Sequence, residues 1–235
     1  MDQRNPEVNV EKHPARVRDM FARIAPRYDL INRLMTGGMD IRWRREVVHL
    51  ARLTPRASLL DLGTGTGDLA RAALTHSPQA RVTAADFTLE MMRAGKTKNG
   101  GLNFSSADAL KLPFKDKTFD AVVSGFLMRN VVDIQEALKE QHRALKPGGR
   151  IVILDTTHPK KNILSPFIKF HMRVVIPALG GLLSGAREAY TYLPDSTERF
   201  LTAEELSVRM LAAGFKRVNF KRLMFGTIAI HWGER

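Results

Sequence analysis

Hydrophobic positions in the first part of the chain recur at helical spacing. Four of them fall at i, i+3, i+4 and i+7 and would share one helix face: Val17, Met20, Phe21 and Ile24. Pro26 interrupts this pattern, and further helices are predicted over residues 28–35 and about 40–53. We therefore expect a flexible N-terminus over residues 1–14, followed by a helical lid over residues 15–56.

From Ser58 onward, short apolar segments alternate with helical ones. Strands are predicted over residues 58–62, 81–86, 103–107, 119–124 and 150–154. The intervening helices include one with Thr88 as its N-cap and one with a capping box formed by Asp133 and Glu136. Pro147-Gly-Gly149 is expected to end the latter helix. Strands that alternate with helices predict a parallel sheet with right-handed crossovers.

The C-terminal part has a different pattern. A capping box of Thr202 and Glu205 predicts a helix that stops at Gly214. Two strand-like stretches follow, 215–224 and 227–232, and the short turn between them requires antiparallel pairing. The fold class is therefore α/β: a doubly wound, mostly parallel seven-stranded sheet with an antiparallel C-terminal strand. Residues 15–235 form one domain, with a core at 57–155, an insert at 156–200 and a helix and hairpin at 201–235.

A glycine-rich loop, Asp61-Leu-Gly-Thr-Gly-Thr-Gly-Asp68, lies at the first strand-to-helix turn. Its glycines let a ligand approach the backbone, and the helix N-terminus presents free N–H groups. Glycine spacing alone leaves a dinucleotide motif open, because the form that starts at Gly65 and ends in Ala70 fits. A carboxylate at Asp68 would repel a pyrophosphate, so the loop favours a ligand with a cationic or neutral centre.

Acidic residues also end the next two strands. Asp86 follows Asp61 by 25 residues, where nucleotide-binding α/β folds place a ribose-binding carboxylate, and Asp108 would meet an adenine edge. Each could instead be a helix cap or a solvated loop residue. Together with the glycine loop they resemble the class I S-adenosylmethionine-dependent methyltransferases. The resemblance implies S-adenosylmethionine as cofactor and these binding residues: Asp61, Gly63, Gly65, Thr66, Gly67, Asp86, Phe87, Asp108, Ala109 and Gly125.

More specific segments resemble the ubiquinone/menaquinone biosynthesis C-methyltransferase family over residues 15–235. They are Tyr28-Asp-Leu-Ile-Asn-Arg-Leu-Met-Thr-Gly-Gly38 with Trp43-Arg-Arg45, Ala109-Leu-Lys-Leu-Pro-Phe114, Arg129-Asn-Val131, Leu145-Lys-Pro-Gly-Gly149 and Tyr190-Thr-Tyr-Leu-Pro-Asp-Ser196. The chain departs from the family pattern at Gly63-Thr-Gly65, near Asp40, at Leu127 and at Asp155, where the family usually has Glu.

The family resemblance implies methyl transfer to a ring carbon of a reduced prenylated quinone, with demethylmenaquinol as the substrate. A benzoquinol of the ubiquinone pathway is the alternative. Arg129 would stabilise a developing phenolate or hold a water that acts as base, and Asn130 would hold a quinol oxygen. Tyr28 would contribute from the lid. The competing interpretations are a surface ion pair for Arg129 and a half-buried core tyrosine for Tyr28.

Histidines and methionines are less informative. His158 is either the base or a loop residue without a role, and His142 is expected to be solvated on a helix face. No spacing predicts a metal site. The methionines are expected to fill the core or pocket: Met20, Met35, Met91, Met92 and Met128.

Composition and charge narrow the partners. The chain has 235 residues, no cysteine and a net charge of +13, which excludes disulfides, a thiolate nucleophile and cysteine-bound zinc. Residues 1–60 carry net +5, 61–157 net +2 and 158–235 net +6. The surplus therefore lies outside the core, where it favours an anionic membrane surface. We expect a cytoplasmic protein that binds transiently at the inner face of the membrane.

The insert has the composition of an interfacial cover for a lipid quinol. Apolar Ile163, Leu164, Phe167, Ile168 and Phe170 alternate with Lys160, Lys161, Lys169 and Arg173, before an apolar run at 174–183. The alternative is a helix that packs its apolar side on the core.

Three other functions compete with quinol methylation. An RNA methyltransferase suits the high pI, but the chain lacks a basic aromatic stripe and an amino-methylating loop after the fourth strand, so nucleic acid is not expected as a partner. A non-catalytic cofactor-binding scaffold is disfavoured by the intact loop and the Arg129-Asn130 pair, and a nicotinamide oxidoreductase by Asp68. A homodimer stays open.

Overall fold

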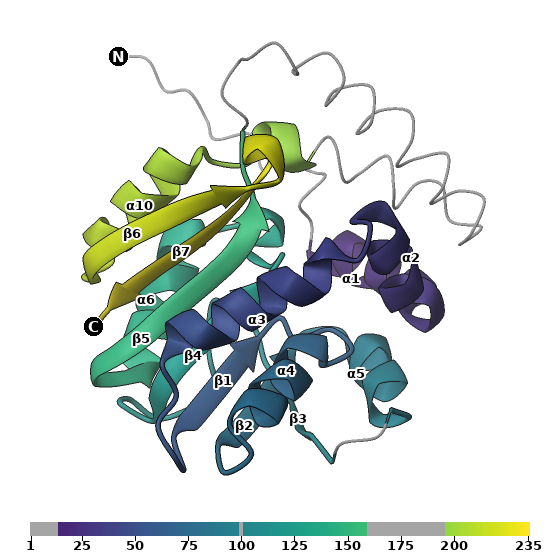
Figure 1. Ribbon diagram of the computed structural model, residues 1–235, viewed down its shortest axis with the longest axis horizontal. Helices are drawn as coiled ribbons and strands as arrows, with labels where there is room; N and C mark the ends of the chain where they lie inside the picture. Colours follow the sequence, from purple (N-terminus) through teal and green to yellow (C-terminus); the bar gives the residue numbers. More distant parts are fainter. Residues whose placement is uncertain (1–13, 99–100, 159–195) are drawn as a thin grey trace.

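A computed structural model describes residues 14–98, 101–158 and 196–235 of the chain. Its strands are β1 (Ser58–Leu62), β2 (Arg81–Asp86), β3 (Asn103–Ser106), β4 (Phe119–Gly125), β5 (Leu145–Thr156), β6 (Lys216–Leu223) and β7 (Ile228–Glu234). Within the described residues they form one seven-stranded sheet in the order β3-β2-β1-β4-β5-β7-β6 (Figure 1). β1 to β5 pair in parallel, and β7 runs antiparallel to both β5 and β6. The predicted fold class is confirmed.

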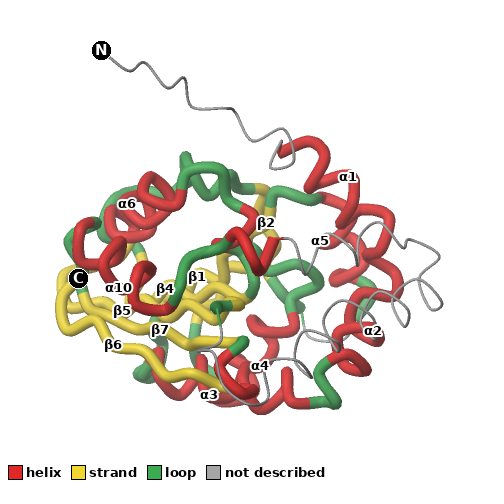
Figure 2. The backbone as a smooth tube through the Cα atoms, turned by 90° about the horizontal axis from the view of Figure 1, so that it is seen from above, coloured by secondary structure: helices red, strands yellow, loops and turns green. Residues whose placement is uncertain are grey.

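Helices cover both faces of this sheet. They are α1 (Pro14–Ile24), α2 (Tyr28–Met35), α3 (Met39–Ala51), α4 (Asp68–His76), α5 (Leu89–Lys96), α6 (Ile134–Ala144) and α10 (Ala203–Ala212), with short 3-10 turns η2 (Ala25–Arg27), η3 (Met128–Asn130) and η5 (Met224–Gly226). Viewed from above, the strands form a layer with α6 and α10 on one side and α3 and α4 on the other (Figure 2). Two hydrophobic cores result, one on each face.

The three N-terminal helices differ in what they contact. α3 buries Trp43, Val47 and Val48 in the core that it shares with α4 and the sheet. α2 buries Ile31 and Met35, but its Leu30 and Leu34 are exposed. Of the lid expected over residues 15–56, only α1 and α2 remain candidates. α3 belongs to the layer of helices that covers the sheet.

The segment Leu145-Lys-Pro-Gly-Gly149 is the clearest correction to the predicted elements. α6 already ends at Ala144, and the segment forms the start of β5. Leu145 pairs with Phe119, and the register then shifts before Ala121 pairs with Arg150. A bulge of this kind tolerates a proline inside a sheet, so Pro147-Gly-Gly149 does not serve as the helix stop.

Two predicted caps also differ in detail. Thr202 and Glu205 form the full capping box, as predicted. Asp133 accepts the Glu136 N–H at 2.9 Å, but the Glu136 carboxylate pairs with Lys139 instead of returning a bond. Thr88 makes no side-chain cap for α5, and its N–H donates to Asp86 instead.

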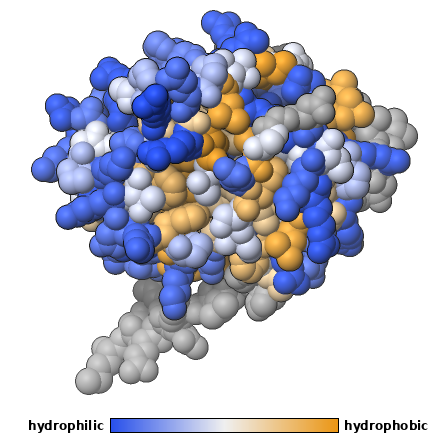
Figure 3. Space-filling view, turned by 90° about the horizontal axis from the view of Figure 1, so that it is seen from below, coloured by the Kyte–Doolittle hydropathy of each residue, from blue (hydrophilic) through white to orange (hydrophobic). Residues whose placement is uncertain are grey.

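The described surface is mixed in polarity. Viewed from below, hydrophilic side chains surround a band of hydrophobic ones across the middle of the face (Figure 3). Among the described residues, no helix combines the length and apolar character needed to cross a bilayer. The lysine-rich and apolar insert residues at 160–183, His171 and the segment 190–195 lie outside the described residues. All five methionines assigned to the core or pocket are buried.

Candidate active site

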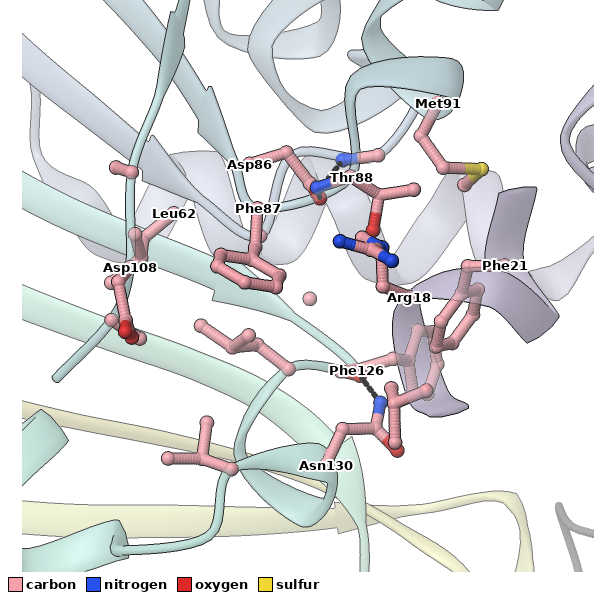
Figure 4. A pocket seen from close by; sticks show the side chains of 18 of the residues that line it. Arg18, Phe21, Leu62, Asp86, Phe87, Thr88, Met91, Asp108, Phe126 and Asn130 are labelled. Atoms are coloured by element: carbon pink, nitrogen blue, oxygen red, sulfur yellow. Dashed lines mark hydrogen bonds between the residues drawn. The ribbon is translucent and has the colours of Figure 1, made fainter. Parts of the chain in front are cut away.

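A pocket opens at the carboxyl ends of β1, β2 and β4, beside α1 and α2. This is the edge at which open α/β sheets bind ligands. Nine residues that the sequence singled out line it: Tyr28, Gly63, Gly65, Asp86, Phe87, Asp108, Ala109, Gly125 and Asn130. Asp86 and Thr88 lie on one side of the cavity and Asn130 on another, and Asp108 faces Arg18 and Phe21 across it (Figure 4).

The glycine loop is tied to the end of β2. The Gly65 N–H donates to Asp86 Oδ2 at 2.7 Å, and the Thr88 N–H donates to Asp86 Oδ1 at 2.7 Å. Burial raises the pKa of Asp86, and these backbone hydrogen bonds oppose the rise. A Cβ on Gly63 would lie 2.9 Å from Leu127 Cδ1, and φ at Gly63 is +68°. Only glycine allows the loop to approach the opposite wall this closely.

Three of the residues predicted to bind the cofactor brace the loop from behind. Asp61 is buried and accepts the Thr64 hydroxyl at 2.6 Å and the Ala70 N–H at 3.0 Å, and burial raises its pKa to about 7. The Thr66 hydroxyl donates to Asp29, and a Cβ on Gly67 would lie 2.6 Å from Leu102 Cδ1. Asp61, Thr66 and Gly67 are thus not among the pocket-lining residues.

Asp68 requires a correction. Its carboxylate lies 2.9 Å from Lys98 Nζ, 3.5 Å from an Arg44 nitrogen and 3.9 Å from an Arg71 nitrogen. Burial opposes ionisation of Asp68, yet the hydrogen bond from Lys98 and these positive charges hold its pKa below the usual range. Because its charge is compensated and it does not line the pocket, the argument that Asp68 repels a pyrophosphate is wrong.

Arg129 is buried below the pocket wall. Its Nη1 lies 2.7 Å from Asp155 Oδ1, and its backbone N–H donates to Asp155 Oδ2 at 3.2 Å. The guanidinium lies 5.0 Å from the centroid of the Phe126 ring. The alternative of a surface ion pair is therefore wrong, since Arg129 and Asp155 are 6% and 1% exposed. Arg129 is not among the pocket-lining residues, so any effect on a substrate is electrostatic and acts over a distance.

Tyr28 and Asn130 both face the cavity. The Tyr28 ring packs edge-on against Phe21, with centroids 6.0 Å apart. Burial raises the pKa of Tyr28, and the nearby charge of Arg129 opposes the rise only in part. Its hydroxyl therefore stays protonated at neutral pH and is a hydrogen-bond donor. Asn130 donates its amide N–H to the Phe126 carbonyl at 3.0 Å, which fixes the side chain at the pocket edge.

Among the described residues, no histidine lines this cavity. His142 packs edge-on against Phe215 and burial lowers its pKa, so it is partly buried and less solvated than expected from the sequence. His231 is buried, with Nε2 2.9 Å from the Ala203 carbonyl, and burial lowers its pKa to about 4. His158 is not among the pocket-lining residues. Over the described residues, no group of three or more metal-ligating side chains comes together.

The pocket also contains residues that sequence reasoning did not assign to it. They are Val17, Arg18, Phe21, Leu62, Thr88, Ala107, Leu110, Phe126, Leu127, Val131 and Val132. Met91, which was expected to fill the core or pocket, also lines it. The spacing of Val17 and Phe21 predicted the helix face but gave no sign that this face borders a cavity. Arg18 had no signal in the sequence.

Comparison with known proteins now identifies the family. The ubiE/COQ5 methyltransferase family matches residues 9–235. The chain belongs to this family. The ubiquinone/menaquinone biosynthesis C-methyltransferase UbiE of Desulfotalea psychrophila is 48% identical over 93% of this chain and 90% of its own length. The demethylmenaquinone methyltransferase of Thermus thermophilus is 46% identical over 92% of this chain and its whole length. The resemblance predicted from the sequence is confirmed.

Solved structures of the same fold are more distant in sequence than these ubiE/COQ5 relatives. The [4+2]-cyclase SpnF matches with a TM-score of 0.68 at 16% identity, over 94% of this chain and 95% of its own. Phosphoethanolamine N-methyltransferase 2 of Haemonchus contortus, solved with S-adenosyl-L-methionine, matches with a TM-score of 0.59 at 14% identity, over 83% and 52%. These likenesses support the fold.

Proposed function

We propose that this ubiE/COQ5 family enzyme transfers a methyl group from S-adenosylmethionine to a ring carbon of a prenylated quinol, with demethylmenaquinol as substrate. Relatives at 46% and 48% identity carry names for this reaction class. The observation that carries the proposal is a single cavity with two chemically distinct sides. One side presents Asp86 and the glycine backbone, and the other presents Tyr28 and Asn130.

The cavity fits the cofactor on the evidence of its own residues. Gly63 leaves backbone open where a Cβ would collide with Leu127, and Gly65 leaves it open where a Cβ would lie 3.2 Å from the Met91 methyl group. Asp86 would accept the ribose hydroxyls, and Asp108 and Ala109 would border the adenine. Both Asp86 oxygens already accept one backbone N–H, which fixes the carboxylate in place for further acceptance. When bound here, S-adenosylmethionine supplies an electrophilic methyl group on a sulfonium centre.

The opposite side fits an aromatic quinol. Phe126, Leu127 and Val131 give an apolar wall, and Tyr28 and Asn130 offer hydrogen bonds to the quinol oxygens. Loss of a proton from a quinol hydroxyl to solvent would make the adjacent ring carbon nucleophilic. The buried positive charge of Arg129 favours the resulting phenolate, and Asp155 holds Arg129 in position. After the ring carbon has taken the methyl group, its own ring proton would leave to solvent and restore the aromatic ring. The hydroxyl of Tyr28 is protonated at neutral pH and can donate a hydrogen bond, so we assign it to orientation of the quinol.

A substrate comparison tests the proposal. Reduced demethylmenaquinone and a demethylated benzoquinol with the same prenyl tail would be supplied with S-adenosylmethionine, and kcat/KM measured for each. We expect a higher kcat/KM for the naphthoquinol. Asn130→Ala should lower kcat/KM by about tenfold, while the cofactor Kd by calorimetry stays within about twofold. A preference for the benzoquinol would assign the enzyme to the alternative pathway.

The partners and location follow from the same proposal. A prenylated quinol is a membrane lipid, so the protein must meet a bilayer, and we propose a transient peripheral contact on the cytoplasmic side. Support comes from α2, where Leu30 and Leu34 are 58% and 50% exposed, and from Met39 after it, 41% exposed. These apolar side chains belong to a basic N-terminal region beside the pocket, which suits an anionic lipid surface.

A further inference from the structure

A cluster of polar side chains joins α2 to the glycine loop outside the pocket. Lys98, just after α5, contacts the Asp29 carboxylate of α2. The same ammonium lies 3.1 Å from Thr66 Oγ1 in the glycine loop and 2.9 Å from Asp68 Oδ1 in α4. The Thr66 hydroxyl in turn donates to Asp29 Oδ1 at 2.7 Å. Asp29, Thr66 and Lys98 therefore close a small ring across three segments.

The elements joined in this way each supply a wall of the pocket. Tyr28 precedes Asp29, and Gly65 precedes Thr66; both line the cavity, as does Met91 of α5. The carbonyl of Thr66 is also held, because Arg71 Nη1 donates to it at 2.7 Å. Asp29, Thr66 and Lys98 themselves are absent from the pocket lining. They can therefore act on a bound ligand only through the walls that they fix.

α2 has a small buried face, and its other side-chain contacts include the ion pair of Arg33 with Asp40 of α3 at 3.3 Å and the packing of Tyr28 against Phe21. The helix has eight residues and buries only Ile31 and Met35. A helix this short is not stable alone and relies on tertiary contacts. Asp29 and Lys98 are 25% and 32% exposed, so their attraction is screened less than that of a fully exposed pair. This ion pair bridges 69 residues of sequence, and its loss would loosen α2 without removing a core side chain.

We propose that Asp29 and Lys98 are positioning residues whose ion pair, closed over the Thr66 hydroxyl, holds α2 against the glycine loop and thereby slows the escape of bound cofactor. This inference rests on the proposed function, in which S-adenosylmethionine occupies the pocket beside Tyr28 and Gly65. Asp29→Asn leaves Lys98 paired with Asp68, and Lys98→Met leaves Asp68 beside Arg44 and Arg71. In both cases Gly65 keeps its bond to Asp86, so the glycine loop keeps its other contacts.

The test compares Asp29→Asn, Lys98→Met and the double variant. Dissociation of radiolabelled S-adenosylmethionine would be followed after a chase with unlabelled compound. We expect each single variant to release the label about tenfold faster, equal to about 1.4 kcal/mol. The double variant should be no faster than the worse single one, because the two residues act as a pair. Lys98→Arg, which keeps the charge, should stay close to the unaltered protein.

Two controls separate this role from general instability. Lys221→Met removes a different long-range pair, Lys221 with Glu46 at 3.2 Å. Neither residue lines the pocket, so this variant should leave the dissociation rate unchanged. The melting temperature of the ligand-free Asp29→Asn protein should fall by no more than about 2 °C. An unchanged dissociation rate in Asp29→Asn, or additive effects in the double variant, would overturn the inference. If the unaltered protein fails to bind the cofactor, the proposed function falls as well.

Discussion

Gly63 shows how a single position controls the site. Its φ of +68° disfavours any other residue, and a Cβ there would press on Leu127, which lines the pocket. Gly148 has a similar φ of +75°, but a Cβ there would meet nothing within 4 Å. Replacing either glycine would therefore strain the backbone, but only a side chain at position 63 would also collide with a neighbour.

We predict that Gly63→Ala and Gly148→Ala each lose about 1 kcal/mol of stability from the strained backbone. Only Gly63→Ala should also weaken cofactor binding, by tenfold or more, because Leu127 must move into the cavity. Isothermal titration calorimetry on both variants measures this. Equal cofactor affinities would show that the Gly63 collision does not matter for the site.

His231 gives the protein a defined response to acid. Its pKa falls from an ordinary value of 6.5 to about 4, because the buried ring is costly to charge. Between these two values the unfolded chain binds more protons than the folded one, so stability rises with pH from about 4 to about 6.5 and is fully present above that. The shift corresponds to about 3 kcal/mol.

We predict that His231→Gln, whose amide can still donate to the Ala203 carbonyl, loses less stability between pH 6.5 and pH 4.5 than the unaltered protein does. Urea unfolding at both pH values measures the difference. The raised pKa of Asp61 acts in the opposite direction, but it is common to both proteins and cancels. An identical pH dependence in the two proteins would argue against a neutral buried His231.

The sequence predicted the glycine loop, but it did not predict which loop residues line the pocket and which support the loop from behind. Glycine spacing and Asp86 at a strand end are local signals, and Gly63, Gly65 and Asp86 all line the pocket. Asp61 and Thr66 face away from the cavity because of the conformation of the loop, in which Gly63, Gly65 and Gly67 have positive φ. The spacing of residues in the sequence does not specify this conformation. Compensation of Asp68 depends on Lys98 and Arg44, which are distant in sequence and were not foreseeable.

At the scale of elements, α5 is unusual because a glycine inside it allows close packing. A Cβ on Gly95 would lie 2.5 Å from the Thr66 carbonyl oxygen and 2.8 Å from Phe104 Cζ. Alanine normally stabilises a helix interior by about 1 kcal/mol relative to glycine. Here the collision must move α5 away from the glycine loop, so the sign of the effect should reverse.

We predict that Gly95→Ala destabilises the protein by about 1–3 kcal/mol, as overpacked sites do. The urea midpoint measures this, with Arg93→Ala on the exposed side of the same helix as control. A more stable Gly95→Ala protein would mean that α5 does not pack against the loop in the way described.

Element boundaries were predictable where the signal is local. The bounds of β1 and β2 match the prediction to the residue, because both apolar runs end at a loop acid or glycine. The start of β5 was not predictable from the sequence, because the pairing of Leu145 with Phe119 and the bulge after it are long-range features. The family resemblance placed Tyr28 of α2 at the site, but the sequence did not show that Val17, Arg18 and Phe21 of α1 also line the pocket. Periodicity identifies an apolar helix face without saying what that face contacts.

At the scale of the whole molecule, the sheet topology could be predicted from the alternation of strands with helices and from the tight turn after β6. Strands that alternate with helices required parallel pairing, and the short connection after β6 required the antiparallel β7. The net charge of +13 first allowed nucleic acid as a partner. Its position outside the core, together with the exposed leucines of α2, now favours a lipid surface.

We predict that the protein co-sediments with anionic liposomes at low salt and is released as salt rises. Leu30→Ser with Leu34→Ser should reduce the bound fraction several-fold by removing apolar anchors. The matched control is Val208→Ser with Leu211→Ser on α10, where the side chains are 63% and 54% exposed, at the other side of the molecule (Figure 1). An equal loss of binding in both pairs would argue against α2 as the contact.

Transfer of label to a lipid tests the central claim most directly. Purified protein would be given methyl-labelled S-adenosylmethionine with either reduced demethylmenaquinone or bulk RNA, and the label followed into the organic and aqueous phases. We predict label in the organic phase, on the quinone, with none in RNA. Label in RNA, with none in the organic phase, would contradict the assignment of a quinol methyltransferase.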